Sequence, residues 1–452
     1  MRALVVVAAL AACKGKTPEQ KPVTGSGSGS GSAKDPWAGA DAQPETPATR
    51  QARADAALKR VHDIEPKLAK LRHLTLEHEI PAEYQSKDDF RKFVHHEIEK
   101  ESAHEADAQT AYVQLGLLPA GIDLAKAEEQ AFATQAAAYY DPAQKKFFLV
   151  QVPDGDAMLD ATSAHELTHG LQDQHFDLKA YMGEGSAGPK LDDDAAAARR
   201  FVVEGDATFA MFLYAIGDSD PPASVVNMVA TQLEGFGDID SMVDAMIGGG
   251  VGSGELAESM KAMKEIPKSI LIPMIDSYLK GALVSIAAYQ QGGWPAIDAL
   301  YKDPPESTEQ VLHPKEKLLG HRDHPKKITL SKLPNTTEVT SNVLGELMWQ
   351  VYFGLWKHSG GEHVSENWGG DRFALVKTKA GGVLVLVATA WDSDADAKRF
   401  LDAYLSTVDA RLAAAGHAGK IATKLVGSRV FIVDGSDDPA VMAALVSGAK
   451  IE

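Results

Sequence analysis

The stretch Ala164-His-Glu-Leu-Thr-His-Gly-Leu171 determines how the middle of this 452-residue chain folds. Its apolar residues, at 164, 167 and 171, are spaced by three and four, which is the period of an apolar stripe along an α-helix. His165 and His169 are four residues apart, so on a helix they lie one above the other on a different face. The sequence therefore predicts a helix with one apolar face and one face that carries both histidines.

The two histidines and Glu166 between them are groups suited to a metal ion. Two imidazoles on one helix face present two ring nitrogens to a single zinc ion. In metalloproteases with this spacing, the glutamate takes a proton from water at the metal and passes it to the leaving amine. Asp173, four residues beyond His169, is positioned to accept a hydrogen bond from a ligand imidazole. The sequence thus predicts a zinc site with His165 and His169 as ligands and Glu166 as general base.

A catalytic zinc ion normally has three protein ligands, and two residues compete for the third place. Glu204 lies in an otherwise apolar helix, where a lone carboxylate is costly unless it is paired or binds a metal. His175 follows His169 by six residues, the spacing of metzincin proteases, but that pattern needs glycine where this chain has Gln172. We therefore favour Glu204 over His175. The remaining candidates are Asp177, Glu184 and Asp192.

The arrangement of His165-Glu-x-x-His169 on one helix with Glu204 on a later helix resembles the gluzincin branch of zinc metallopeptidases, to which thermolysin belongs. The gap to the glutamate is longer than in thermolysin, and the asparagine that precedes that glutamate is missing here. The resemblance therefore implies the gluzincin type, with zinc as cofactor and a zincin-like fold, but not thermolysin's substrate preference.

A closer similarity is to uncharacterised bacterial metallopeptidase lipoproteins. The shared segments are a Tyr-Tyr-Asp-Pro hairpin, a His-Glu-Leu-Thr-His helix that runs into Leu-Gln-Asp-Gln-His, and a Val-Glu-Gly segment. Gly292-Gly-Trp294 and the stretch Ser307-Thr-Glu-Gln-Val-Leu-His-Pro314 also fit this group. The similarity covers about residues 137–320 and implies that the substrate is a peptide or protein.

One further catalytic group is expected from this resemblance. Gluzincins often place a His or Tyr downstream of the glutamate ligand, where it donates a hydrogen bond to the tetrahedral oxyanion. His313 and Tyr278 are the candidates, and we assign the role to His313. Because Glu309 lies four residues before His313, a simple helix pair is the alternative.

The N-terminus carries the pattern of a bacterial lipoprotein. Arg2 precedes a short apolar segment, and Leu10-Ala-Ala-Cys13 matches a lipobox, in which the cysteine is acylated. The alternative is an ordinary signal peptide with an incidental Cys13. The Gly-, Ser- and Pro-rich residues 14–47 are expected to form a flexible tether. The sequence therefore predicts a lipid-anchored, extracytoplasmic protein of the bacterial cell envelope, attached to the membrane through Cys13.

Composition excludes several classes of protein. With 45 Lys and Arg against 63 Asp and Glu, the net charge is −18, and no long basic run is present that would bind the phosphates of nucleic acid. A single cysteine excludes an internal disulfide framework and a cysteine-rich zinc module. Beyond the N-terminus, no segment is expected to reach the ~18 apolar residues of a spanning helix.

Periodicity along the chain predicts an α+β fold that is predominantly helical. Strands are expected at 138–150 as a hairpin and at 373–376, 383–387 and 430–433. Helices are expected at 156–174, 195–215, 255–291, 343–356 and 394–412. The predicted regions are a signal peptide at 1–12, a disordered tether at 13–48, a helical region at 49–135, a zincin-like catalytic domain at 136–330 and a small α+β domain at 331–452.

Two other functional hypotheses remain open at this stage. In the first, a surface lipoprotein uses the zincin fold as a binding or assembly module without catalysis, although the intact Glu166 argues against it. In the second, the chain is a helical scaffold lipoprotein in which the histidine spacing is accidental. The sequence does not determine the oligomeric state.

Overall fold

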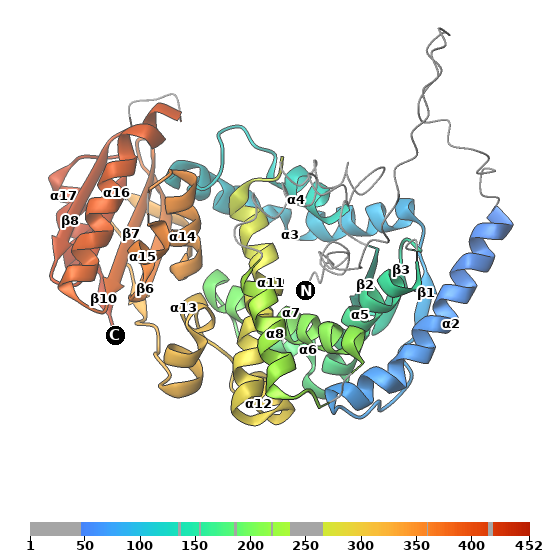
Figure 1. Cartoon of the computed structure of the whole chain (residues 1–452). Coiled ribbons are helices and arrows are strands. Elements are labelled where there is room, and N and C mark those ends of the chain that lie inside the picture. The colour runs from blue at the N-terminus through green and yellow to red at the C-terminus, as the bar shows by residue number, and fades with distance from the viewer. Residues whose placement is uncertain are drawn as a thin grey trace, which may run out of the picture.

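The computed structural model describes residues 47–133, 137–152, 155–184, 188–217, 220–235, 265–358, 360–414 and 419–452. The fold is α+β and predominantly helical, as predicted (Figure 1). Cys13 and the predicted signal peptide and tether lie outside the described residues.

A helical core occupies the centre of the molecule, and α5, α7 and α11 form its middle (Figure 1). The predicted helices at 156–174 and 195–215 are confirmed as α5 and α7, with ends that differ by one or two residues. The helices of this part of the chain are α2 (Pro47–Arg72), α3 (Lys87–Leu115), α4 (Leu124–Ala133), α5 (Asp156–Phe176), α6 (Leu178–Tyr181), α7 (Asp193–Ile216), α8 (Ala223–Glu234), α11 (Lys268–Gly292), α12 (Trp294–Lys302), α13 (Thr308–Leu312) and a π-helical segment (Pro314–Gly320).

Helix α11 runs without interruption through Pro273 and is the most apolar long helix among the described residues. Its length and composition would allow it to cross a membrane, contrary to our expectation from the sequence. However, 67% of its most apolar window is buried inside the fold, and the helix packs along α7. We therefore assign α11 as the central core helix.

The contact between α7 and α11 depends on two glycines. A Cβ atom on Gly205 of α7 would lie 2.0 Å from the carbonyl oxygen of Gly281 on α11, and a Cβ on Gly281 would lie 2.4 Å from the carbonyl oxygen of Phe201. Such distances are far below van der Waals contact, so neither position accepts a side chain without separating the helices. The glycines let the two backbones touch.

A small sheet lies against α5 in the order β1-β3-β2. Its strands are β1 (Ala82–Tyr84), β2 (Ala138–Asp141) and β3 (Lys146–Leu149). The predicted hairpin is confirmed as the antiparallel pair β2–β3, and β1 adds to it in parallel. Because β3 is the middle strand, the edge nearest α5 belongs to β2.

The C-terminal region contains an antiparallel five-stranded sheet in the order β5-β6-β7-β9-β8. Successive residues of its strands alternate between two apolar clusters, one under α14 and α16 and the other under α17. The elements are β4 (Ile328–Thr329), β5 (Thr336–Asn342), α14 (Gly345–Leu355), α15 (Gly361–Ser365), β6 (Trp368–Thr378), β7 (Val383–Trp391), α16 (Asp394–Ala414), β8 (Ile421–Val426), β9 (Arg429–Asp434), α17 (Pro439–Gly448) and β10 (Lys450–Ile451).

Contacts cross two of the predicted region boundaries. The predicted helical region at 49–135 is divided between cores, because α2 packs on α5 while Ala111 and Leu115 of α3 belong to the cluster under α14. Strand β4, which precedes residue 331, pairs with β10 at the end of the chain. Strands β1, β4, β5, β8 and β10 are absent from the sequence-based prediction.

Candidate metal centre

Helices α5 and α7 bring three metal-binding side chains to one point. His165 and His169 of α5 and Glu204 of α7 are all buried, with exposed fractions of 0%, 0% and 1%. Nε2 of His165 lies 3.2 Å from Nε2 of His169. Oε2 of Glu204 lies 3.3 Å from each of these nitrogens. The three atoms therefore form a nearly equilateral triangle, which we call the triad.

The size of the triad fits a zinc ion. Bonds of about 2.0–2.1 Å at tetrahedral angles hold neighbouring ligand atoms about 3.3 Å apart. Two imidazole nitrogens and one carboxylate oxygen are also a donor set of catalytic zinc sites, which keep a fourth position for water. The side chains present therefore match the predicted ion in both donor type and spacing.

Burial and mutual charge shift the pKa values of the triad. Burial lowers the pKa of His165 to about 4, so its ring is neutral at neutral pH. Burial opposes ionisation of Glu204, but the His169 imidazolium and the hydrogen bonds from both histidines outweigh it and lower the pKa of Glu204 to about 2. Burial likewise lowers the pKa of His169, but the Glu204 carboxylate outweighs it and raises that pKa to about 9. Glu204 thus favours a positive charge at this point.

Gln172 orients one of the ligand rings. Its Oε1 lies 2.9 Å from Nδ1 of His169, so the amide oxygen accepts the ring N–H and leaves Nε2 facing the triad. The amide nitrogen of Gln172 donates to Oδ2 of Asp206 at 2.9 Å. Asp206 in turn accepts from Nε of Arg72 at 2.7 Å and from the Tyr301 hydroxyl at 2.9 Å. A chain of buried hydrogen bonds therefore fixes His169 through α7, α2 and α12.

Glu166, the predicted general base, is fully buried beside the triad. Its Oε2 accepts a hydrogen bond of 2.8 Å from the backbone N–H of Tyr140 in β2, and its Oε1 has no hydrogen-bond partner among the described residues. A carboxylate oxygen of Glu166 lies within 4.8 Å of a ring nitrogen of His165 and of His169. Burial raises the pKa of Glu166 to about 8. Oε1 of Glu166 is therefore available to exchange a proton beside the triad.

Two residues near the end of α5 do not contact the ligands. Asp173, predicted to orient a ligand imidazole, accepts instead from the Tyr140 hydroxyl at 2.9 Å and from the Leu178 N–H at 3.0 Å. Gln172 takes the predicted role because it lies three rather than four residues after His169. His175, the alternative third ligand, has its Nε2 2.7 Å from the carbonyl oxygen of Thr75, away from the triad.

The other candidates from the sequence lie outside the triad. His313 has its Nε2 3.0 Å from Oε1 of Glu346 in α14, so it does not join the cluster that we predicted it to serve. Tyr278, the second oxyanion candidate, lies much closer, because its ring centroid is 5.5 Å from that of His165. Asp177 and Asp192 accept from backbone N–H groups at the starts of α6 and α7.

A cavity of about 360 Å³ opens beside the triad. Glu204 and Arg200 contribute to it from α7, and Tyr278 contributes from α11. Its volume lies in the range of small-molecule and peptide side-chain pockets, which is about 300–1,000 Å³. We call this cavity the cleft. It gives a ligand access to Glu204 and to Tyr278.

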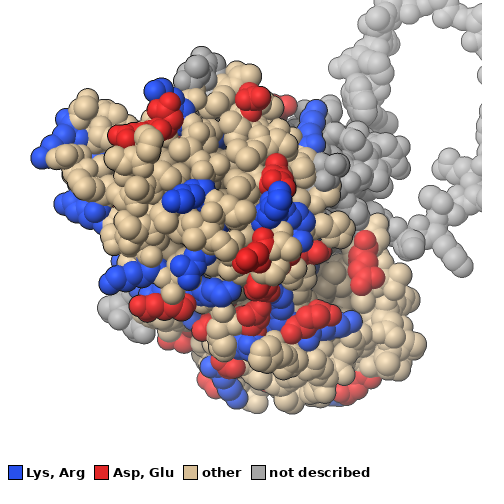
Figure 2. Space-filling model, turned by 90° about the vertical axis from the view of Figure 1, so that its left-hand side faces the viewer, with Lys and Arg blue, Asp and Glu red and all other residues tan. Residues whose placement is uncertain are grey.

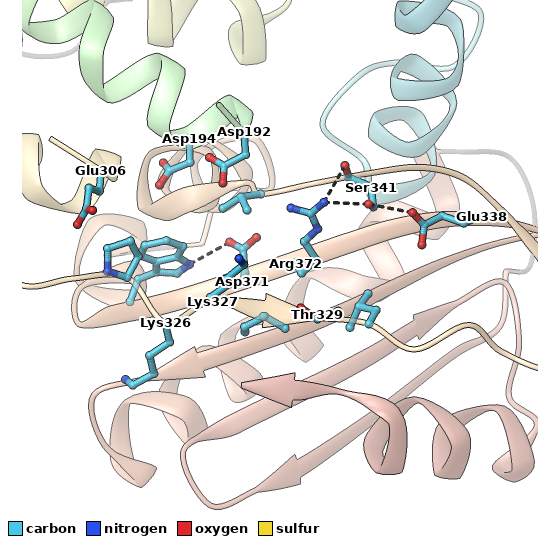
Figure 3. Close-up of a pocket in the computed structure, with 15 residues that line it drawn as sticks. Asp192, Asp194, Glu306, Lys326, Lys327, Thr329, Glu338, Ser341, Asp371 and Arg372 are labelled. Atoms are coloured by element: carbon cyan, nitrogen blue, oxygen red, sulfur yellow. Dashed lines mark hydrogen bonds between the residues drawn. The ribbon is translucent and has the colours of Figure 1, made fainter. Parts of the chain in front are cut away.

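A second cavity, of about 460 Å³, lies between the start of α7 and the strands β5 and β6. Figure 3 shows that Arg372 in this cavity bonds to Ser341, while the carboxylate of Asp371 accepts from the indole of Trp368. Asp194 borders both cavities. The triad does not line the second cavity, whereas Glu204 lines the cleft, so we place the candidate centre in the cleft.

The comparisons with known proteins concern the C-terminal region. Residues 332–445, from just before β5 to α17, match a family model described as a domain of unknown function, DUF8575. No curated protein and no solved structure matches the chain. The matched residues exclude the triad but include α14.

Proposed function

We propose that this protein is a zinc metallopeptidase of the gluzincin type with a zincin-like catalytic core. The observation that carries the proposal is the triad, in which two imidazole nitrogens and a carboxylate oxygen lie 3.2–3.3 Å from one another in a buried site. The buried Glu204 carboxylate needs positive charge beside it, and a metal ion can supply that charge in place of the His169 proton. His165, His169 and Glu204 would hold the ion.

The reaction follows from the groups around the triad. A bound zinc ion would supply Lewis acidity to the carbonyl oxygen of the substrate and increase the acidity of water. Glu166 takes the proton from the attacking water through its unpaired Oε1 and passes it to the nitrogen of the leaving amine. Tyr140 holds the other oxygen of Glu166, which fixes the orientation of the carboxylate. Gln172 keeps the His169 ring in one tautomer.

Peptide as the substrate rests on the similarity of the segments between residues 137 and 320 to bacterial metallopeptidase lipoproteins. The same similarity, together with the lipobox that ends at Cys13, supports attachment to the bacterial cell envelope on its outer, extracytoplasmic side. The alternative, a binding module with the same metal site but no hydrolysis, shares every ligand with the peptidase. Only an activity measurement separates the two.

The test is to measure zinc content and proteolysis together. We expect about one zinc ion per chain in the purified protein and in Glu166→Gln, by elemental analysis, and cleavage of an unfolded protein by the first only. Failure to bind zinc at micromolar concentration would refute the metal site. Zinc in both proteins with cleavage by neither would favour the binding module.

A further inference from the structure

A buried ion pair lies close to the triad in the sequence of α7. Nε and Nη2 of Arg72 donate to Oδ1 and Oδ2 of Asp206 at 2.7 and 3.1 Å, and both side chains are fully buried. On the outer face of the C-terminal region, by contrast, charged side chains of both signs lie at the surface (Figure 2). Because two buried charges lose their hydration, such a pair contributes little net stability. Its contacts indicate a different role.

The ion pair stands at one end of a hydrogen-bond chain that reaches the triad. A guanidinium can only donate, and a carboxylate that is paired with it can only accept. The Gln172 amide therefore turns its NH2 group toward Asp206, with Nε2 2.9 Å from Oδ2. The backbone carbonyl of Val203 accepts from the same nitrogen at 3.1 Å. Both acceptors favour one orientation of the amide.

The orientation of this amide decides how His169 meets a metal ion. With its NH2 group toward Asp206, Gln172 presents Oε1 to Nδ1 of His169 at 2.9 Å. An amide oxygen accepts but does not donate, so it holds the proton on Nδ1 while a metal ion replaces any proton on Nε2. The reversed amide would present an NH2 group to Nδ1 and favour the tautomer that keeps its proton on Nε2. The chain thus transmits a direction from Arg72 to the triad.

The Gly292-Gly-Trp294 motif holds the guanidinium in place. Cζ of Arg72 lies 4.6 Å from the centre of the buried Trp294 ring, which is a cation–π distance. Gly293, between α11 and α12, has φ of +64°, a left-handed conformation that suits glycine. Nη2 of Arg72 also donates to Oδ1 of Asp298 in α12 at 2.6 Å. The turn at Gly293 thus lets one short helix contact Arg72 through two side chains.

We propose that Arg72 and Asp206 are positioning residues of the metal centre. Through Gln172, they select the tautomer of His169 that binds zinc. The Gly292-Gly-Trp294 motif acts one step further away, because it holds Arg72. This inference rests on the metal site of the proposed function, and it does not depend on whether the bound ion takes part in hydrolysis.

The test is a double-mutant cycle on zinc affinity, measured by chelator competition. Asp206→Asn keeps the shape of the side chain but replaces a pure acceptor by an amide, so we expect zinc affinity to fall about 10–100-fold. In a Gln172→Ala background, the same substitution should reduce the affinity little further, because the link through which it acts is already missing. Fully additive losses in the double variant would overturn the proposal.

Asp434→Asn is the matched control. Nη2 of Arg411 lies 2.7 Å from Oδ2 of Asp434, both side chains are almost fully buried, and Cζ of Arg411 lies 5.8 Å from the centre of the Tyr404 ring. This pair has the same chemistry but belongs to the C-terminal region. We expect both Asp→Asn substitutions to lower the midpoint of urea denaturation and only Asp206→Asn to change zinc affinity. An equal loss of affinity in the control would overturn the proposal.

A second pair of variants tests the role of the motif if Asp206→Asn does not fold. Trp294→Phe keeps an aromatic face for Arg72 and should retain the zinc affinity of the wild type. Trp294→Leu removes that face and should lower the affinity about tenfold. Equal affinity in these two variants would contradict the proposed hold on Arg72.

A spectroscopic measurement detects the tautomer itself. In zinc-loaded protein with ¹⁵N-labelled histidine, the buried proton on Nδ1 of His169 should exchange slowly with water and give a resonance. We expect Asp434→Asn to keep this resonance and Asp206→Asn to lose it. An unchanged resonance and affinity in Asp206→Asn would overturn this inference and leave the metal site standing. Failure of the wild-type protein to bind zinc would refute both. Selective loss in Asp206→Asn, in a protein that cleaves nothing, would support the inference and contradict the peptidase.

Discussion

Two clusters of potential metal ligands in this protein differ in whether a lysine side chain lies among the ligands. Glu309, Asp323 and Asp392 place carboxylate oxygens within 4.8 Å of one another, as His165 and His169 do with Glu166. In the acidic cluster, the Lys317 ammonium lies 2.5–3.1 Å from all three carboxylates.

In the triad, the charge of Glu204 is balanced by the proton of the His169 imidazolium and not by a lysine or arginine side chain among the described residues. Its Nε2 and Oε2 atoms face one another, and Arg72, the buried cation of the region, is already paired with Asp206 and Asp298. The comparison teaches that ligand type and proximity alone do not identify a metal site. In the acidic cluster a lysine side chain fixed in the fold balances the carboxylates, whereas in the triad the balancing charge is a histidine proton that a metal ion can replace.

The largest expected effect is on zinc affinity. Glu204→Ala should weaken zinc binding at least about 10⁴-fold, because it removes the only anionic ligand of the triad. Glu309→Gln, in the acidic cluster, and His175→Ala should leave the affinity unchanged. Competition titration with a chromogenic chelator measures all three. A greater loss in His175→Ala than in Glu204→Ala would overturn the ligand assignment.

Substitution of Glu166 should reduce hydrolysis without preventing metal binding. Glu166→Gln keeps the hydrogen bond from Tyr140 available but removes the base, so we expect kcat to fall about a thousandfold with zinc still bound. Single-turnover cleavage and metal analysis of the same sample provide the check. Undiminished kcat would show that another group takes the proton.

A substitution in the acidic cluster should change the stability of the protein and not its zinc affinity. Lys317→Met leaves the buried Glu309 without its cation, and we expect the free energy of unfolding to fall by about 2–3 kcal/mol. Zinc affinity should not change. Urea denaturation gives the first quantity and chelator competition the second. A protein of unaltered stability would mean that Lys317 does not balance the cluster.

A smaller effect is expected at Gln172. Gln172→Ala removes the acceptor for the His169 ring N–H, and losses of this kind typically reduce metal affinity about 10–100-fold. Gln174→Ala, two residues later on the same helix, removes a half-buried side chain that bonds to the His78 carbonyl and serves as the control. Equal zinc affinity in the two variants would argue against an orienting role for Gln172.

The smallest expected effect is on stability, at the hydrogen bond between His313 and Glu346. The hydrogen bond to Glu346 raises the pKa of His313 above its usual 6.5, although burial opposes the shift. The folded state therefore holds this proton more tightly, so the contribution to stability is complete below pH 6.5 and is lost as the pH rises through the raised value. We expect His313→Gln to remove a stabilisation of less than about 1 kcal/mol at pH 6 and none at alkaline pH. Thermal unfolding across this range would reveal the difference.

Sequence reasoning was most successful where the chemistry is local. The four-residue spacing of His165 and His169 fixes their common face, and the cost of a lone carboxylate on an apolar helix identified Glu204 as a partner for them. The structure brings these three side chains together. A signal for Gln172 was also present, because an amide three residues after His169 shares its face, but the sequence analysis considered Gln172 only as a departure from the metzincin pattern.

The errors arose where distant segments decide the contacts. Asp173 bonds to Tyr140, and His313 bonds to Glu346, which lies in a helix that sequence periodicity does not connect to the metal region. Strands β5 and β8 were missed because they lie at the edges of their sheet and carry many polar residues. Pairing with β6 and β9, rather than local composition, makes them strands.

The contact of Gly205 with Gly281 has a consequence for the choice of metal. Glu204 precedes Gly205 in α7, so a side chain at Gly205 or Gly281 would displace the helix that carries Glu204. A triangle of 3.2–3.3 Å suits bonds near 2.0–2.1 Å, while ions such as Ca²⁺ need about 2.3–2.6 Å. A larger residue at either glycine is therefore expected to shift Glu204 relative to His165 and His169 and to alter the size of the triangle.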